Sequence, residues 1–446
     1  DAYLTFGYVP TPMTFYEGIL SVPPGHVVVV EPGKEPQVSE YWLPPLVAPG
    51  RDARIEMSLG DAAGEVRRLL EESVERRLIS DVPLGAFLSG GIDSSAIVGI
   101  MASKLDRPVS TFTIGFTDEH GFDERPYART IAERFSTDHH EFVVEPKAVD
   151  LIERLVWHHD QPFGDSSAVP TFLLSELTRT EVTVALSGDG GDELFAGYER
   201  FAAALALARY RRVPRKLRGA LEAAVDRGRP ETLGGRVGSL QRFTRRADLD
   251  TLEAYRSWVA FAPDETLRAL LPGGSDWALA QYRSTWARSA GAETLDRLQD
   301  LNIRTYLVDD LLVKADRMSM AHALEVRSPF LDPALADFAL RLPPSARLRG
   351  PVLKRVLKHA LRDLLPRQIL HRRKKGFGVP LDRWFREDLK SFMEAKLGSP
   401  NASIRSHLVP AELDRLLAEH DRRTANHGQL LWALLTLEVF LERQAW

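Results

Sequence analysis

The sequence predicts an α/β protein with a parallel-sheet core and a helical C-terminal half. Between about residues 58 and 200, short apolar stretches alternate with stretches of helical periodicity. This alternation is typical of a parallel sheet that is covered by helices on both faces. Beyond residue 200 the strand patterns fade, and amphipathic runs such as residues 295–321 and 429–443 indicate helices.

The predicted elements follow one another in a regular order. The first helix is expected over residues 58–79, where Val66, Leu70 and Val74 recur at helical spacing. Strands are expected within residues 83–91, 108–116, 139–144 and 182–193, with helices at 93–105 and 123–135. Before residue 45, two short β-branched stretches bounded by proline and glycine indicate strands that are too few to fold alone.

The composition limits the classes of protein to which the chain can belong. With 446 residues, 44% of them hydrophobic, it is long enough for one large domain or two to three ordinary ones. Its net charge of −4 gives no general attraction for nucleic acid, and we expect no nucleic-acid partner. The sequence has no cysteine, which excludes disulfides and a cysteine nucleophile from it. Because no apolar run approaches the roughly 20 residues of a membrane-spanning helix, we expect a cytoplasmic protein with no membrane partner.

The stretch FLSGGIDSS, residues 87–95, places glycines and serines where a strand ends and a helix begins. Backbone N–H groups at such a turn point at an anion, and the glycines let a ligand approach the backbone, so the stretch predicts a phosphate site. It lacks the lysine of a Walker A loop. Asp93 beside a phosphate requires a cation between them, and Mg²⁺ prefers carboxylate and phosphate oxygens. A plain helix cap is the alternative interpretation.

A second stretch, LSGDGGDELFAGY at residues 186–198, repeats this pattern at another strand end. Asp189, Asp192 and Glu193 place three carboxylates within five residues, and like charges this close repel one another unless a cation or a shifted pKa relieves them. Both strand ends face the same crevice of a parallel sheet. The two loops therefore predict a magnesium–nucleotide site, with a surface turn as the alternative.

The two stretches together resemble a known family. SGGIDSS resembles the pyrophosphatase loop of the N-type ATP pyrophosphatases, and with LSGDGGDELFAGY and LEVRSPFLD (324–332) the chain resembles the synthetase domain of the asparagine synthetase B family. The resemblance implies an adenine nucleotide alpha hydrolase-like, Rossmann-like core at about 58–200 and a helical part at about 201–446, both within a domain spanning 49–446. It further implies that residues 1–48 are the C-terminal remnant of an Ntn-type glutaminase domain.

The activity that the resemblance implies is an ATP-dependent ligation. Aspartate or a related carboxylate is adenylated with release of pyrophosphate, and ammonia derived from glutamine displaces AMP to give asparagine. ATP and Mg²⁺ are the implied cofactors, and a homodimer is implied as well. Relatives that amidate a cell-envelope or natural-product carboxylate, or that close a ring with an internal amine, are alternatives, as is a tRNA-modifying ATP pyrophosphatase. The last of these fits poorly with an acidic chain that lacks cysteine.

The resemblance also assigns residues to the expected site. The residues implied to hold ATP and its pyrophosphate are Leu88, Ser89, Gly90, Gly91, Asp93, Ser94, Ser95, Ile114, Ser187 and Gly188. Asp93 and Asp192 are the implied magnesium ligands. Asp189 is the candidate for the acyl-acceptor chemistry, although it is one methylene shorter than the glutamate of many relatives.

A cation is also needed at the reacting phosphate. The stretch HRRKKGFGVP, residues 371–380, offers Lys374, which best matches the family's catalytic lysine, with Lys375 as the alternative. On the bare sequence, four consecutive cations are more often a solvated face or a nucleic-acid patch. The acceptor is expected to meet Asp165, Ser166 and Ser167, and Arg327 is expected to contact substrate or phosphate. Residues 309–332, which include Lys314, are implied to form a wall of the site, or else a core-facing helix with paired charges.

The histidine pairs at 139–140 and 158–159 lack the spacing of a zinc motif. We expect structural roles for them.

Overall fold

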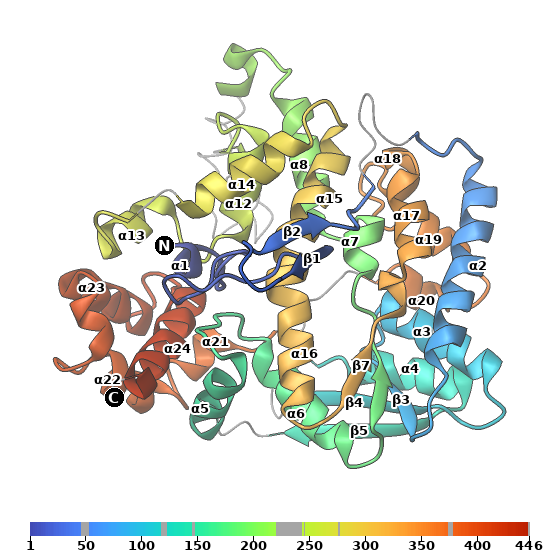
Figure 1. Ribbon diagram of the computed structural model, residues 1–446, viewed down its shortest axis with the longest axis horizontal. Coiled ribbons are helices and arrows are strands. Elements are labelled where there is room, and N and C mark those ends of the chain that lie inside the picture. Colours follow the sequence, from blue (N-terminus) through green and yellow to red (C-terminus); the bar gives the residue numbers. More distant parts are fainter. Residues whose placement is uncertain are drawn as a thin grey trace.

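A five-stranded parallel sheet forms the centre of the first half of the chain, as the sequence predicts (Figure 1). The computed structural model describes residues 1–45, 53–116, 123–144, 148–219, 243–244, 246–274, 277–372 and 378–444. The strand order is β5-β4-β3-β6-β7, and each neighbouring pair is parallel. The strands are β3 (Leu84–Phe87), β4 (Ser110–Phe116), β5 (Asp138–Val144), β6 (Val184–Leu186) and β7 (Glu325–Arg327).

Strand β7 corrects the expectation that strands end near residue 200. It pairs with β6 in the register Leu186↔Arg327, which adds an edge strand from the helical half of the chain. Three residues are too few to show a period of two. The strand therefore depends on its tertiary partner and has no sequence pattern of its own.

Helices cover both faces of the sheet, as a parallel sheet requires. On one face lie α2 (Leu59–Arg77), α3 (Ile92–Lys104), α4 (Arg125–Phe135), α17 (Pro333–Arg341), α18 (Pro344–Arg347), α19 (Arg355–Ala360) and α20 (Arg367–Leu370). Helix α2 begins at the Ser58 cap, whose hydroxyl accepts the Asp61 N–H, and it buries Val66, Leu70 and Val74 completely. On the other face α6 (Ala168–Arg179) packs against β4, with Leu174 beside Phe112 and Ile114.

A second core is built almost entirely from helices (Figure 1). Its helices are α5 (Ala148–His159), α8 (Glu199–Tyr210), α12 (Thr251–Val259), α13 (Asp264–Leu270), α14 (Trp277–Arg288), α15 (Thr294–Asn302), α16 (Leu312–Met320), α21 (Leu381–Trp384), α22 (Lys390–Leu397), α23 (Pro410–Asp421) and α24 (Gly428–Gln444). A π-helix, Ile303–Leu311, joins α15 to α16, and α7 (Gly191–Phe195) follows β6. Short 3₁₀ turns lie at Pro329–Leu331 and Ser403–Ser406. Within the described residues, the helices are too short or too polar to cross a bilayer.

The N-terminal segment is part of this second core. Helix α1 (Ala2–Phe6) packs against α24: the Tyr3 hydroxyl donates to the Ala433 carbonyl at 2.7 Å, and the Phe6 ring stacks on Tyr282 with 4.3 Å between centroids. The hairpin of β1 (His26–Val29) and β2 (Gln37–Glu40) is antiparallel and largely exposed. A division of the chain at residue 48 stays a prediction.

The histidines make contacts that fit structural roles. His159 is buried at the end of α5, where its Nδ1 lies 2.8 Å from the Leu155 carbonyl and its ring stacks on Phe163 at 4.3 Å. His139 bonds through Nδ1 to the Thr111 hydroxyl at 2.8 Å. Burial lowers the pKa of His159 to about 4.

We expect Leu4→Ala to lower the free energy of unfolding by about 2 to 5 kcal/mol, because the side chain leaves a cavity between α1 and the C-terminal helices. Leu20→Ala is the matched control, since Leu20 is 65% exposed. Chemical denaturation measures both variants. Equal midpoints and slopes for the two would contradict the integration of α1 into the second core.

We expect stability to fall with acid partly through His159. A histidine whose folded-state pKa lies below its unfolded value of about 6.5 contributes stability above that value and loses it as the pH falls towards 4. From about pH 7.5 to pH 5, the free energy of unfolding should drop about 2 kcal/mol further in the wild type than in His159→Gln. Denaturation curves at both pH values test this, and parallel pH profiles would count against it.

Candidate active site

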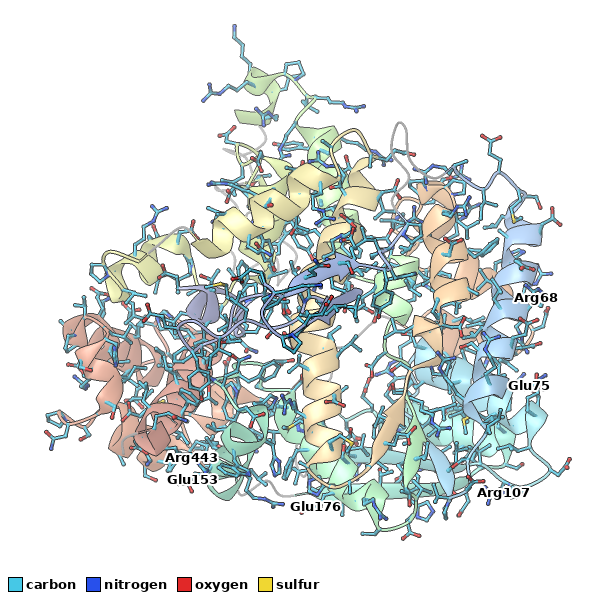
Figure 2. All side chains as sticks on the ribbon, in the orientation of Figure 1. Arg68, Glu75, Arg107, Glu153, Glu176 and Arg443 are labelled. Atoms are coloured by element: carbon cyan, nitrogen blue, oxygen red, sulfur yellow. The ribbon has the colours of Figure 1, made fainter. Side chains whose placement is uncertain are left out.

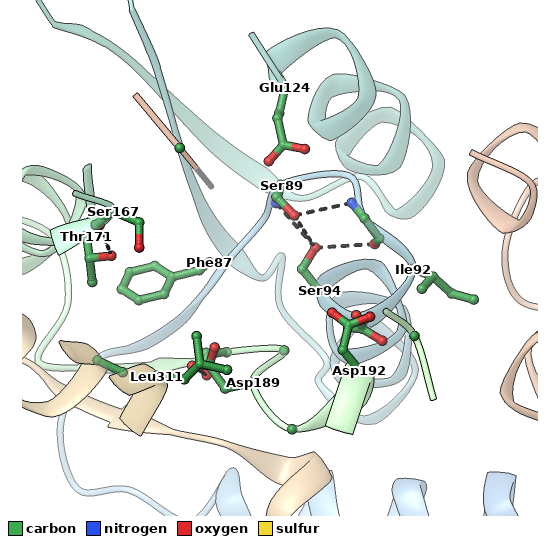
Figure 3. A pocket seen from close by; sticks show the side chains of 18 of the residues that line it. Phe87, Ser89, Ile92, Ser94, Glu124, Ser167, Thr171, Asp189, Asp192 and Leu311 are labelled. Carbon is green, nitrogen blue, oxygen red and sulfur yellow. Dashed lines mark hydrogen bonds between the residues drawn. The ribbon is translucent and has the colours of Figure 1, made fainter. Parts of the chain in front are cut away.

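A cavity of about 680 Å³ opens at the carboxyl ends of strands β3, β4 and β6. Parallel strands direct their following loops to one edge of the sheet, which is where open α/β folds bind ligands. Ser89, Ser94 and Asp192 lie together on one side of it, and Ser167 and Thr171 on the other (Figure 3). We call these sides the loop end (Ser89, Gly91, Asp93, Ser94, Asp192 and Lys354) and the Lys314 end (Asp165, Ser166, Ser167, Tyr306 and Lys314).

The loop after β3 is shaped by a glycine and a pair of serines. Gly90 has a φ of +65°, and a Cβ there would lie 2.4 Å from the Tyr127 carbonyl carbon, so only glycine fits. The Ser89 and Ser94 hydroxyls are 3.1 Å apart, and Ser94 also donates to the Gly91 carbonyl (Figure 3). The hydroxyls and the first N–H groups of α3 thus line the loop end, as a phosphate cradle needs.

The loop after β6 comes into direct contact with the first loop. A Cβ on Gly188 would lie 2.9 Å from the Cβ of Asp93, and one on Gly191 would lie 2.4 Å from its Oδ1. These two glycines therefore let the loops approach until Asp93 and Asp192 lie near one another. Ser187, Gly188 and Ile114 line the same cavity, and so does Leu88.

Lys354 lies between the two carboxylates. Its Nζ is 2.7 Å from Oδ1 of Asp192 and also contacts Oδ2 of Asp93. Burial alone would lower the pKa of Lys354, but the carboxylates of Asp192 and Asp93 raise it above its ordinary value, so the side chain is a cation. Its backbone is left-handed, with a φ of +52°, an uncommon conformation for a residue with a side chain.

Lys358 follows one helical turn later and also lines the cavity. Burial, and next the charge of Lys354, lower the pKa of Lys358. Neither lysine is among the residues predicted from the sequence. A single lysine at residue 354 has no spacing pattern that links it to loops more than 150 residues earlier in the chain.

The Lys314 end is held by an ion pair. Lys314 Nζ lies 2.6 Å from Asp165 Oδ2 and 2.7 Å from the Ser167 hydroxyl, which itself donates to Asp165 at 2.6 Å. Burial would raise the pKa of Asp165, but Lys314 and the Ser167 hydrogen bonds outweigh it and lower the value to about 2. Asp165, Ser166 and Ser167, the candidate acceptor residues, are thus brought into the same cavity as the two loops.

Asp189 is electrostatically coupled to both ends. The Ser187 hydroxyl donates to its Oδ2 at 2.8 Å. Burial raises the pKa of Asp189. The charge of Lys314 lowers it by a smaller amount, and the charge of Asp192 raises it by a smaller amount. A raised pKa makes a carboxylate a stronger base than an ordinary aspartate.

The family model described as asparagine synthase matches residues 65–442, which is most of the chain. The chain belongs to the asparagine synthase family.

Individual members of the asparagine synthase family match over nearly the whole chain. A Mycobacterium tuberculosis protein, provisionally named an asparagine synthetase (glutamine-hydrolyzing), is 34% identical over 97% of this chain and 65% of its own length. Asparagine synthetase (glutamine-hydrolyzing) 1 of Bacillus subtilis is 27% identical over 98% of this chain and 67% of its own. Amidase chry2 of Gibberella zeae is 25% identical over 83% and 60%. The chain thus spans about two thirds of the length of these relatives.

One residue expected at the site of this asparagine synthase domain lies elsewhere, and this corrects the prediction for Arg327. Its guanidinium donates to the carbonyls of Arg77 and Ile79 at 2.8 and 2.7 Å and to Glu325 at 2.6 Å. Successive side chains of a strand point to opposite faces, and Val326 lines the cavity, so Arg327 points away from it.

Two further residues of the first loop do not line the cavity. Gly90 packs against α4, and Ser95 is completely buried in α3. The candidates Lys374 and Lys375 lie outside the described residues.

The described residues hold no group of three or more histidine, aspartate or glutamate side chains arranged for a metal ion. Asp93 and Asp192 nevertheless form a donor set of the kind that Mg²⁺ uses, since that ion takes one or two carboxylates and completes its shell with phosphate oxygens and water. The residues present therefore fit a magnesium ion that arrives with a nucleotide.

We expect Lys354→Met to destabilise the protein by about 3 to 5 kcal/mol at neutral pH, because it leaves Asp93 and Asp192 as neighbouring buried like charges. Protonation relieves such a repulsion, so the loss should be smaller near pH 5 than near pH 7.5. Denaturant unfolding at both pH values measures it. Lys216→Met, at an exposed lysine, is the control, and an equal loss in the two variants would count against the bridge.

Proposed function

We propose that the chain is a ligase that forms an amide at the cost of ATP. A carboxylate, aspartate or a related acid, is first adenylated with release of pyrophosphate, and ammonia then displaces AMP. The observation that supports this most is the joint placement of Lys354, Asp93 and Asp192 beside a serine-rich strand-end loop, in the same cavity as a second polar cluster at Lys314. A nucleotide and an acceptor can therefore meet in one cavity.

In this proposal the loop end holds the nucleotide. Ser89, Gly91 and Ser94 bind the phosphates through hydroxyl and N–H groups, and Leu88 and Ile114 contact the adenosine. Mg²⁺ would be held by Asp93 and Asp192 and would neutralise charge on the phosphate oxygens.

The first chemical step transfers the adenylyl group. An oxygen of the acceptor carboxylate bonds to the α-phosphorus, the bond from that phosphorus to the bridging oxygen breaks, and pyrophosphate leaves with the electron pair. Lys354 and Lys358 place positive charge where negative charge accumulates, which is the electrostatic contribution that phosphoryl and adenylyl transfers need.

The second step forms the amide. The nitrogen of ammonia bonds to the acyl carbon, the bond from that carbon to the AMP oxygen breaks, and the nitrogen loses a proton. Asp189, with its raised pKa and its position between the charges of Lys314 and Asp192, accepts that proton in our proposal.

A second candidate function keeps the chemistry and changes the acceptor. Two relatives bear the name amidase, chry2 of Gibberella zeae and chyE of Penicillium rubens, at 25% and 27% identity. Their similarity is compatible with an acceptor other than aspartate, such as the cell-envelope or natural-product carboxylate of the alternative. A homodimer and an ammonia supply from glutamine stay predictions.

The proposal is tested by pyrophosphate release from ATP and Mg²⁺ with ammonium present, with and without aspartate. We expect aspartate-dependent release and asparagine formation, and a fall in kcat of about 10²- to 10³-fold in Lys354→Met. Lys216→Met should behave as the wild type. Lys374→Met is assayed in parallel. The two variants show whether the reaction depends on Lys374, the cation predicted from the sequence, or on Lys354, which lies between the carboxylates.

Three outcomes bear on the proposal in different ways. Pyrophosphate release that does not depend on any of the carboxylates tested would contradict amide synthesis. Release with another carboxylate but not aspartate would favour the second candidate function. Full activity of Lys354→Met would remove that lysine from the proposed chemistry.

A further inference from the structure

Among the described residues, five cationic side chains line the cavity, and they differ in whether a carboxylate neutralises them. Lys314 pairs with Asp165, Lys354 with Asp93 and Asp192, and Arg372 with Glu124 at 2.6 Å. Lys358 and Arg200 form no ion pair with any described carboxylate. Lys358 lies one turn from Lys354 at the loop end, whereas Arg200 lies in the first turn of α8, which follows the second glycine loop in the chain.

Aromatic rings hold Arg200 in place. Its guanidinium carbon lies 3.7 Å from the ring centroid of Tyr198, 4.9 Å from that of Tyr306 and 5.8 Å from that of Tyr255. These ring faces attract a cation and offset part of the cost of its burial, but they do not cancel its charge.

The Arg200 side chain has one hydrogen bond, to Tyr255, and leaves one edge of its guanidinium without a protein partner. Its Nε and Nη2 atoms are buried, and neither has a hydrogen-bond partner among the described residues. These two N–H groups form the side of a guanidinium that binds a carboxylate with two parallel hydrogen bonds. Arg218, Arg297 and Arg347 each leave one buried Nε–H without a partner, whereas Arg200 leaves two donors on one edge. Such a pair costs desolvation energy that a bound acceptor with two oxygens would offset.

The placement of Tyr306 connects Arg200 to the Lys314 end. Tyr306 lies in the π-helix, lines the cavity, and is followed by Asp310 and Lys314 on the same continuous helical segment. Arg200 also acts electrostatically on Asp310, whose carboxylate lies 3.9 Å from Lys314. The unpaired guanidinium therefore belongs to the acceptor side of the cavity.

We infer that Arg200 binds a second anionic group of the acceptor, a carboxylate other than the one that is activated. The acceptor is then an acid with at least two carboxylates, and Arg200 is the residue that selects it. This inference rests on the proposed function. Nε and Nη2 are covered in this structure, so the inference requires the guanidinium, which lines the cavity, to turn towards it when the carboxylate binds.

Calorimetric titration tests the inference directly, with protein saturated by Mg²⁺ and an ATP analogue whose α,β bridge cannot be cleaved. The probes are L-aspartate and β-alanine, which is the same molecule without the α-carboxylate, with L-glutamate and succinate as further dicarboxylates. The variants are Arg200→Gln and Arg200→Lys. Arg107→Gln is the matched control, because Arg107 lies on the periphery of the molecule (Figure 2).

We expect the wild type to bind at least one dicarboxylate at least 10-fold more tightly than β-alanine. In Arg200→Gln that affinity should fall about 10- to 100-fold, the loss expected for hydrogen bonds to a charged group. The affinity for β-alanine and for the ATP analogue should stay within about twofold of the wild-type value. Arg200→Lys should recover part of the lost affinity, because lysine keeps the positive charge but cannot donate the two parallel hydrogen bonds of a guanidinium. Circular dichroism of each variant checks that it folds.

Several results would overturn the inference. The first is a wild-type protein that binds no dicarboxylate more tightly than β-alanine. The second is a dicarboxylate affinity that Arg200→Gln leaves unchanged. The third is a loss of affinity for the ATP analogue alone, which would assign the guanidinium to phosphate. Pyrophosphate assays distinguish failure of the Arg200 inference from failure of the proposed ligase function. Acceptor-dependent release without a dicarboxylate preference overturns only the role of Arg200, while Arg200-dependent binding without release overturns only the ligase activity.

Discussion

The contact of Lys354 with Asp93 and Asp192 is the interaction on which the site depends. It joins three segments that are far apart in the chain: the turn after β3, the turn after β6 and the start of α19. Two carboxylates this close would repel one another without a cation, and a lysine this buried would lose its charge without them. The charge balance at the loop end is therefore a property of all three segments together.

The sheet and its glycines make that contact geometrically accessible. Strands β3 and β6 are parallel neighbours, so their loops leave the same edge, and Gly188 and Gly191 remove the side chains that would keep the loops apart. The helical half completes the cavity from the opposite side by means of the π-helix and α16, which supply Tyr306, Leu311 and Lys314. π-helical turns are uncommon and frequently occur at functional sites. Here the π-helix carries Tyr306 and leads into α16, which carries Lys314 at the same end of the cavity.

Local sequence predicted the parts of this site that are local. Ser89 to Ser94 and Ser187 to Asp192 are contiguous, each follows a buried strand, and parallel strands direct both to one edge, so their meeting follows from the pattern alone. Lys354, Lys314 and Arg200 acquire their roles only from tertiary neighbours, and no periodicity marks them. Arg327 lies away from the cavity because side chains alternate along a strand: the neighbouring Val326 lines the cavity, and Arg327 points to the opposite face of β7. Strand β7 itself was too short to predict from its pattern.

The burial of α1 against α24 has a consequence for the order of events in synthesis. Tyr3 bonds to the carbonyl of Ala433, across 430 positions of the chain, and its neighbours Leu4 and Phe6 enter the same core. This contact cannot form until residue 433 has left the ribosome, and until then the apolar surface of α1 stays exposed. The sheet can gather its first four strands early, since they are complete by residue 186. The second core, by contrast, cannot close before α24 has been synthesised.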